Sequence, residues 1–329
     1  GLMDISLLAI SFFGARLIVS DSMTTGQLMS FITYTSQILM SLMMLSMVFV
    51  MITISRASAF RIEEVLAEKS DLFDKEDAIA TVADGSIDFD KVSFSYTKRE
   101  DKLCLRDIDL HIKSGEVVGI IGPTGSGKTS LIQLIPRLYD VYSGSVKVGG
   151  IDVREYKLDS LRCAVSVVLQ KSTLFSGTIK ENLRWGNLEA TDEQLIEACK
   201  IAQADTFIRS FPNGYEAHVE QDGSNLSGGQ KQRLSIARSI LTQPKVLILD
   251  DSTSAVDTQT DSLIRRAFRE QLQETTKIII SQRINSVKDA DQIVVLDEGM
   301  IQAVGTHEQL LTTSEMYREI YDSQSREEA

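Results

Sequence analysis

Gly122-Pro-Thr-Gly-Ser-Gly-Lys-Thr129 fits the pattern G-x-x-x-x-G-K-[ST], which is typical of a phosphate-binding loop between a strand and a helix. Glycines at positions 122, 125 and 127 allow positive φ angles, which turn backbone N–H groups onto phosphate oxygens. Lys128 adds a charged donor for the β- and γ-phosphates, and Thr129 offers a hydroxyl to Mg²⁺. The predicted phosphate-binding residues are Gly122, Thr124, Gly125, Ser126, Gly127, Lys128, Thr129 and Ser130.

The residues on either side of this loop have the expected character. Residues 117–121 form an apolar run typical of a buried strand, and residues 130–135 begin a predicted helix. The positive end of that helix dipole would face the bound anion. A Gly-rich turn that arose by chance is the alternative interpretation.

A second stretch, Leu226-Ser-Gly-Gly-Gln230, begins more than a hundred residues after Gly122. With the following residues 231–238 it resembles the signature motif of ABC-type ATPases, which use ATP. In that family the motif binds the γ-phosphate of ATP held by the opposite subunit, through a serine hydroxyl, glycine N–H groups and a helix N-terminus. The resemblance implies a dimer with two ATP molecules between its subunits, bound in part by Ser227, Gly228, Gly229 and Gln230. A Ser-Gly turn that caps an ordinary helix is the alternative.

Two more positions match residues of the family that surround magnesium. Asp250 ends an apolar run that resembles the Walker B strand, which carries an acidic group to the Mg²⁺ shell. Gln170 matches the glutamine that reaches Mg²⁺ and the attacking water and faces the membrane domain. A loop amide bonded to its own backbone is the alternative for Gln170. The predicted metal set is Thr129, Gln170 and Asp250.

The resemblance also assigns an aromatic and an acidic residue. Tyr96 stands where the family stacks a ring on adenine, although an aromatic residue on a strand is also typical of a core. Asp257 matches the loop that crosses the dimer interface, and its alternative is a plain helix cap.

At two positions the chain departs from the family pattern. Asp251 follows the Walker B residue where the family has the glutamate that acts as general base, and Gln282 replaces a histidine that contacts the γ-phosphate. Asp is one methylene shorter than Glu, and an amide cannot accept and return a proton. Gln170, Asp251 and Gln282 are the candidate catalytic residues. We therefore expect a site that binds ATP but hydrolyses it slowly.

This combination resembles one half of a heterodimeric bacterial ABC exporter, in which one composite site is degenerate. The partner would then be a second exporter half-transporter, to which this chain lends Ser227 and its neighbours. The alternatives are a homodimeric exporter with weakened ATPase and a regulatory nucleotide sensor that does not hydrolyse ATP. A soluble ABC ATPase of DNA repair or translation is a further class, against which an apolar N-terminal region argues.

That N-terminal region predicts contact with membrane lipid. No Asp, Glu, Lys or Arg occurs between Asp21 and Arg56, a length that suffices for a membrane-spanning helix. Residues 5–19 are a second candidate span, for which a signal peptide is the alternative. Basic residues after position 55 place the following domain in the cytoplasm by the positive-inside rule.

The exporter resemblance then gives the domain organisation. Residues 1–69 would be the last two membrane helices, residues 70–85 a linker and residues 86–329 the nucleotide-binding domain. We expect a multi-pass protein of the inner (plasma) membrane, and a fragment that lacks four earlier membrane helices, since two spans cannot enclose a transport path. The exported substrate is not predicted.

Alternating apolar and amphipathic segments predict an α/β fold for residues 86–329, with a parallel sheet at its core. Its strands are predicted at residues 117–121, 246–249, 277–281 and 293–296, and its helices at residues 130–138 and 262–272. The family inserts a helical segment, here from about residue 172 to residue 243. The net charge of −12 disfavours nucleic acid as a partner.

Overall fold

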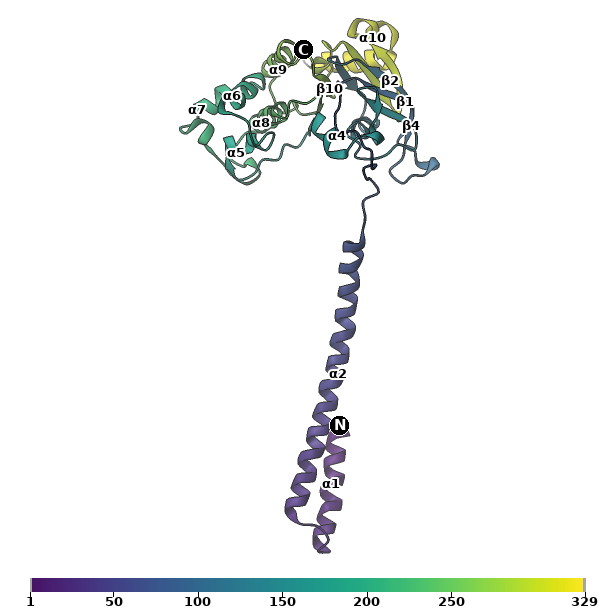
Figure 1. Ribbon diagram of the computed structural model, residues 1–329, viewed down its shortest axis with the longest axis vertical. Helices are drawn as coiled ribbons and strands as arrows, with labels where there is room; N and C mark the ends of the chain where they lie inside the picture. The colour runs from purple at the N-terminus through teal and green to yellow at the C-terminus, as the bar shows by residue number, and fades with distance from the viewer. Residues whose placement is uncertain (1, 328–329) are drawn as a thin grey trace. The chain divides into compact units, whose positions relative to one another are not determined.

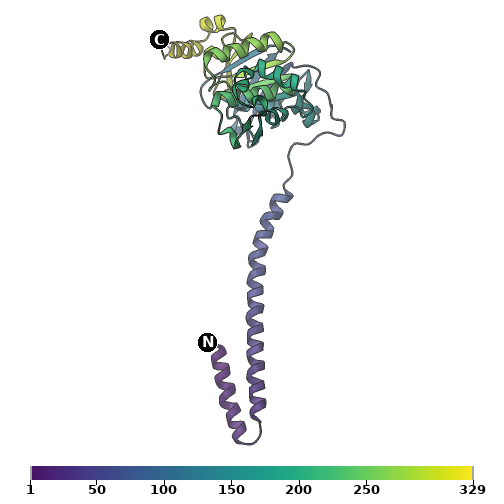
Figure 2. The same cartoon turned by 90° about the vertical axis from the view of Figure 1, so that its left-hand side faces the viewer.

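The computed structural model describes residues 2–327, and contacts divide the chain into two units at Asp71 and Leu72. The N-terminal unit is a pair of antiparallel helices, α1 (Leu2–Val19) and α2 (Thr25–Ala67), which lie side by side in both views (Figures 1 and 2). Gly14 of α1 is buried against Leu28 of α2, where a methyl group would collide with the leucine side chain. The missing side chain at Gly14 therefore allows the close packing of the two helices.

The helix α2 begins at a capping box and continues for 43 residues. The Thr24 hydroxyl accepts a hydrogen bond from the Gln27 N–H, and the Gln27 side chain accepts one from the Thr24 N–H. Within the described residues, α2 is the one helix long and apolar enough to cross a membrane. The prediction of a membrane span is therefore supported for α2. The predicted second span, at residues 5–19, lies in α1 and stays a prediction.

Polar side chains in α2 bond to their own helix. Six hydroxyls donate to the carbonyl oxygen four residues earlier, at distances of 2.7 to 3.0 Å, and belong to Ser30, Thr33, Thr35, Ser36, Ser41 and Thr53. Because these groups are satisfied internally, they cost little in a medium without water.

After Asp71 the chain belongs to the second unit, and its residues before the first strand contact later residues of that unit. Ile79 forms an isolated bridge with Tyr156, and Lys75 pairs with Glu155 at 2.6 Å. The Asp74 carboxylate accepts a hydrogen bond of 2.9 Å from the Leu158 N–H. The later part of the predicted linker is thus held against the C-terminal unit.

A six-stranded sheet lies at the centre of the C-terminal unit. Its strand order is β12-β11-β3-β10-β9-β6, and all neighbours are parallel except β11 and β12. The strands are β3 (Val117–Ile121), β6 (Val165–Val168), β9 (Val246–Asp250), β10 (Thr276–Ile280), β11 (Gln292–Asp297) and β12 (Met300–Gly305). The predicted α/β core with a mainly parallel sheet is confirmed.

Each central strand contributes to two cores, one on each face of the sheet. In β9, Leu247 and Leu249 face one core, whereas Val246 and Ile248 face the other. This double burial explains why the strands read as continuous apolar runs.

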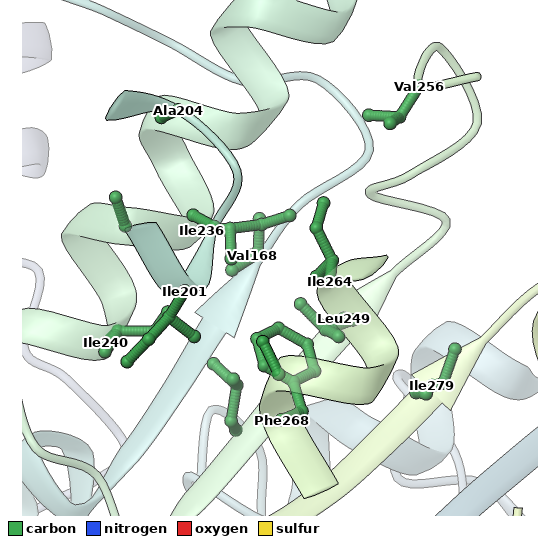
Figure 3. Packing of buried hydrophobic residues seen from close by; sticks show 14 of the residues in the cluster. Val168, Ile201, Ala204, Ile236, Ile240, Leu249, Val256, Ile264, Phe268 and Ile279 are labelled. Atoms are coloured by element: carbon green, nitrogen blue, oxygen red, sulfur yellow. The ribbon is translucent and has the colours of Figure 1, made fainter. Parts of the chain in front are cut away.

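One face of the sheet is covered by helices. Figure 3 shows Ile236 and Ile240 of α8 (Gly228–Leu241) and Phe268 of α9 (Thr258–Gln271) gathered around Val168 and Leu249 of the sheet. The inserted helical segment supplies α5 (Ile179–Arg184), α6 (Asp192–Ile201), α7 (Asp205–Ser210) and a short pair of strands, β7 (Gly177–Thr178) and β8 (His218–Val219). The chain closes with α10 (His307–Thr313) and α11 (Glu315–Glu327).

An antiparallel sheet, with the order β2-β1-β4-β5, packs over the other core. It consists of β1 (Ile87–Phe94), β2 (Leu105–Ile112), β4 (Ser143–Val148) and β5 (Ile151–Asp152), with α3 (Lys128–Leu134) and α4 (Leu158–Ala164) beside it. The sequence analysis did not predict this sheet.

Two predicted helix boundaries were wrong. The helix after the phosphate loop ends at Leu134, not at residue 138, because Pro136 has no N–H to continue the hydrogen-bond ladder. The helix predicted from residue 262 begins at Thr258, where Asp257 caps it.

Candidate functional site

A cavity of about 700 Å³ lies at the carboxyl ends of β3, β9 and β10. It brings together eleven lining residues that belong to, or adjoin, the predicted site: Thr124, Gly125, Gly127, Lys128, Thr129, Ser130, Gln170, Asp250, Asp251, Ser281 and Gln282. The carboxyl ends of parallel strands are where open α/β sheets bind their ligands. The cavity is therefore the candidate nucleotide site.

Glycine is required in the phosphate loop for two different reasons. Gly127 has a φ of 100°, and a Cβ there would lie 2.8 Å from Leu105 Cδ2. Gly122 passes so close to β11 that a Cβ would collide with the Leu296 carbonyl oxygen. The loop thus combines left-handed backbone with close approach, and only glycine accommodates both.

Lys128 is buried at the base of the loop, where it is 9% exposed. Its Nζ donates to the carbonyl oxygens of Gly122, at 2.8 Å, and Pro123, at 2.7 Å. Burial lowers the pKa of Lys128, and the charges of Asp250 and Asp251 oppose that shift. The ammonium group is held by neutral carbonyls, so an incoming phosphate would be a strong additional partner.

Asp250 and Thr129 place two oxygen ligands next to the loop. The Thr129 hydroxyl donates to Asp250 Oδ2 at 3.5 Å. Burial raises the pKa of Asp250, the Asp251 charge raises it further, and the Thr129 hydrogen bond and Lys128 act in the opposite direction. Hydroxyl and carboxylate oxygens are the donors that Mg²⁺ prefers, so this pair fits the ion.

Asp251 and Gln170 form a hydrogen-bonded pair in the cavity. Gln170 Nε2 donates to Asp251 Oδ2 at 3.0 Å, so the amide bonds this carboxylate. Asp251 has a φ of 46°, and its N–H donates to the Ile280 carbonyl oxygen at 2.9 Å. Burial raises the pKa of Asp251, whereas Arg283 and Lys128 lower it.

Tyr96 lies beside the phosphate loop and Ser126 is part of it, and neither residue lines the cavity. The Tyr96 hydroxyl lies 2.9 Å from the Ser130 hydroxyl, and the Tyr96 ring packs edge-on against Phe94 and Tyr139, although it is 48% exposed. Ser126 is buried behind Lys128, 3.4 Å from its Nζ. Tyr96 therefore combines packing on the antiparallel sheet with an open ring face close to the phosphate loop.

The signature residues stand at a different hollow of about 450 Å³, which Gly228, Gln232, Ser254 and Ala255 help to line. Ser227 caps α8: Gln230 N–H donates to the Ser227 hydroxyl at 3.3 Å, and the Gln230 side chain accepts from the Ser227 N–H at 2.9 Å. A Cβ on Gly229 would lie 2.8 Å from the Ala255 carbonyl oxygen. Gln170 is the residue that borders both this hollow and the 700 Å³ cavity.

Asp257 caps α9, which is the alternative reading given for it above. Its carboxylate accepts a hydrogen bond of 2.9 Å from the Thr260 N–H, and this bond lowers the pKa of Asp257. The side chain lines neither of the two hollows.

Several cavity residues had not been predicted. They come from the start of β2 and from the turn between β11 and β12, and they are Leu103, Cys104, Arg106, Glu298 and Gly299. Arg106 N–H donates to the Gly299 carbonyl oxygen at 2.8 Å, and Gly299 N–H donates to Ser126 at 3.1 Å. The Glu298-Gly299 pair could have indicated a hairpin turn, but nothing in the sequence indicates that this turn meets the phosphate loop.

The sequence matches the family described as "ABC transporter" over residues 105–254. It is 40% identical to "Uncharacterized ABC transporter ATP-binding protein YfiB" of Bacillus subtilis, over 98% of this chain and 56% of that protein. It is 36% identical to "Fatty acid ABC transporter ATP-binding/permease protein" of Mycobacterium tuberculosis, over 95% of this chain and 49% of that protein.

A solved structure is also similar to this chain. It is titled "Structure of a bacterial Atm1-family ABC exporter with ATP bound", and the TM-score is 0.82 with 31% sequence identity. The match covers 98% of this chain and 57% of that chain. The present chain spans about half the length of the curated relatives it matches.

Proposed function

Because this chain carries an ATP-binding domain of the ABC transporter family and is close to ABC exporter ATP-binding/permease proteins, we propose that it is the ATP-binding subunit of an exporter with one slow nucleotide site. In this proposal the slow site is the chain's own 700 Å³ cavity. The chain would also lend its signature motif to a faster site on a partner subunit.

ATP binding by the cavity is supported by its complete phosphate loop. Lys128 is buried at the loop and lines the cavity, so its ammonium group could bind a phosphate there. The N-terminus of α3 faces the space that this phosphate would occupy. Thr129 and Asp250 would hold the magnesium ion, with Gln170 nearby. When bound, the ion would neutralise the charge that develops on the phosphate oxygens.

Slow hydrolysis is supported by the two residues that differ from the family pattern, and this observation carries the proposal. Asp251 has a side chain one methylene shorter than Glu, and its carboxylate is already bonded by Gln170 at 3.0 Å. A displacement of about 1 Å at a reacting group can cost ~100-fold in rate. Gln282 lines the cavity with an amide, which can donate a hydrogen bond to phosphate but cannot relay a proton.

The signature motif would serve a second subunit. Ser227 and Gly228 stand at the N-terminus of a 14-residue helix, where a phosphate is favoured, yet they do not line the cavity of their own chain. A partner half-transporter could present its own ATP to them. The asymmetry between binding and hydrolytic residues favours a partner that is a different chain.

The N-terminal unit would anchor this subunit in the inner (plasma) membrane. The apolar part of α2 would cross the bilayer, and α1 would be a second, antiparallel crossing. The basic residues Arg56, Arg61 and Lys69 follow the apolar part, which would place the nucleotide-binding domain in the cytoplasm.

ATPase assays of the purified complex test the proposal. Ser227→Ala should abolish most of its ATP hydrolysis, because it disables the faster site, whereas Asp251→Asn should change the rate less than about twofold. Ser224→Ala is a matched control, since Ser224 is an exposed serine three residues before Ser227.

Equal loss of activity in Asp251→Asn and Ser227→Ala would contradict the slow site. Intact mass of the purified complex separates the two kinds of dimer. A single polypeptide mass would favour a homodimer with two weakened sites in place of the heterodimer.

A further inference from the structure

The segment that carries Gln282 is held by a residue of the last helix of the chain, Gln324. Gln324 Nε2 donates to the Gln282 carbonyl oxygen at 2.5 Å, and Gln324 Oε1 accepts from the Ile284 N–H at 2.8 Å. One side-chain amide thus satisfies a backbone acceptor and a backbone donor on either side of Arg283. This pairing imitates the hydrogen bonding of a neighbouring β-strand.

We propose that Gln324 is a positioning residue for the nucleotide site, which fixes the backbone at Gln282 so that the Gln282 side chain is held at the γ-phosphate position. The inference rests on the proposed function of the cavity and adds a role for α11. Gln324 itself does not line the cavity, so it acts through residues 282–284.

The two ends of this connection are anchored differently. Ile284 is 1% exposed and packs in the core, and the Ser286 hydroxyl donates to the buried Asp261 at 3.4 Å. Between Ser281 and Ile284, by contrast, Gln282 and Arg283 are exposed. The Gln324 amide therefore restrains this exposed part from outside the segment, beside a local bond of 3.0 Å from the Arg283 N–H to the Ser281 hydroxyl.

The helix α11 is well placed to act as a fixed support. Tyr317 is fully buried, and its hydroxyl lies 2.8 Å from His307 Nδ1 on α10. Ile320 and Tyr321 pack against the same core as Ile284. A support that is rigid at both Tyr317 and Ile320 can hold the Gln324 amide in one orientation, which a two-point contact requires.

The restraint also bears on Arg283, which is exposed like Gln282. Arg283 lies between the two backbone groups that Gln324 binds, so loss of the Gln324 contact frees both Gln282 and Arg283. The exposed residues 282 and 283 would then lose order together.

Gln324→Glu is the decisive variant, because it keeps the size of the side chain. Its carboxylate still accepts from the Ile284 N–H, but it faces the Gln282 carbonyl oxygen without a proton to donate. If Gln324 only fills space, Gln324→Glu behaves like the wild type. If it positions the segment, release of bound ATP becomes roughly tenfold faster, as expected for loss of one or two hydrogen bonds.

The experiment measures the release of a fluorescent ATP analogue, loaded with Mg²⁺, from the purified transporter complex. The variants are Gln324→Glu and Gln324→Ala, and the matched control is Ser323→Ala, an exposed neighbour on the same helix. Hydrogen exchange of residues 281–287 is measured in parallel. Faster release and faster exchange in both Gln324 variants, with Ser323→Ala and the melting temperature unchanged, is the expected result.

Equal release rates in the wild type, Gln324→Glu and Ser323→Ala would overturn the role of Gln324. Failure of the slow-site proposal gives a different signature. In that case the wild type turns ATP over rapidly at this site, and the faster release in the Gln324 variants is then measured as a rise in KM for ATP.

Discussion

Restoring the two altered residues should activate the slow site. We consider Asp251→Glu and Gln282→His in a Ser227→Ala background, which silences the faster site and leaves the chain's own cavity to be measured. The added methylene extends the carboxylate by about 1.5 Å, the length of one C–C bond. Asp251 lines the cavity and is bonded by Gln170 at 3.0 Å, and the longer side chain would extend past this contact.

The magnitude follows from these two changes. Correct placement of the carboxylate is expected to recover up to ~100-fold in rate. An imidazole in place of the amide restores proton transfer, which contributes about 10²–10⁴-fold. Residues that act as a unit are not additive, so the double variant should gain between ~10² and ~10⁴ rather than the product of the two factors.

Single-turnover hydrolysis of radiolabelled ATP by the purified complex is the assay. Asp250→Asn, added to the double variant, is the control, because it removes the carboxylate next to Thr129 and should return the rate to background. An unchanged rate in the double variant, with ATP still bound, would refute the reasoning that these two residues limit hydrolysis.

Two further predictions concern the fold and the adenine. Lys277 is 1% exposed, and burial lowers its pKa to about 8, from 10.5 in the unfolded chain. The unfolded chain binds this proton more tightly, so burial of the protonated Lys277 lowers the stability of the fold. This cost is complete below pH 8 and disappears between pH 8 and 10.5. Lys277→Met should therefore raise the melting temperature at pH 7, although the variant also loses the Lys277 hydrogen bonds. Its gain in stability over the wild type should shrink by roughly 3 kcal/mol toward pH 10.5. An equal difference in melting temperature between variant and wild type at both pH values would contradict this. Tyr96→Ala should weaken ATP binding by about 1–3 kcal/mol and Tyr96→Phe by much less, as measured by calorimetry; equal affinity in the alanine variant would leave Tyr96 a packing residue.

The central sheet could be predicted from the sequence because its strands are buried on both faces. The strand β3 is apolar apart from Gly119, and β10 ends in three consecutive isoleucines, so both stand out from the residues around them. The antiparallel sheet gives no such signal. The strand β1 alternates between buried and partly exposed residues, and register shifts near Val92 break the alternation that would have revealed it.

The candidate site was predictable where local backbone carries the chemistry. The phosphate loop and the strand that ends in Asp250 are continuous in sequence, so spacing alone places their residues. Arg106 and Gly299 reach the cavity through a contact between two sheets, at 2.8 Å, which no local pattern encodes. The same holds for Gln324, which meets Gln282 across 42 positions of chain.

The hydroxyls along α2 have a consequence for biogenesis. The hydroxyls of Ser30, Thr53 and four other residues already donate to carbonyl oxygens one turn earlier in α2. None of the six therefore needs a hydrogen-bond partner on another helix. Such a segment can be inserted into the bilayer and stay there as a single helix before it packs against a neighbour. The helix that packs against it is then selected by steric fit, as at Gly14, which leaves space for the Leu28 side chain. Alanine at those six positions would be tolerated more readily than a bulkier residue at Gly14.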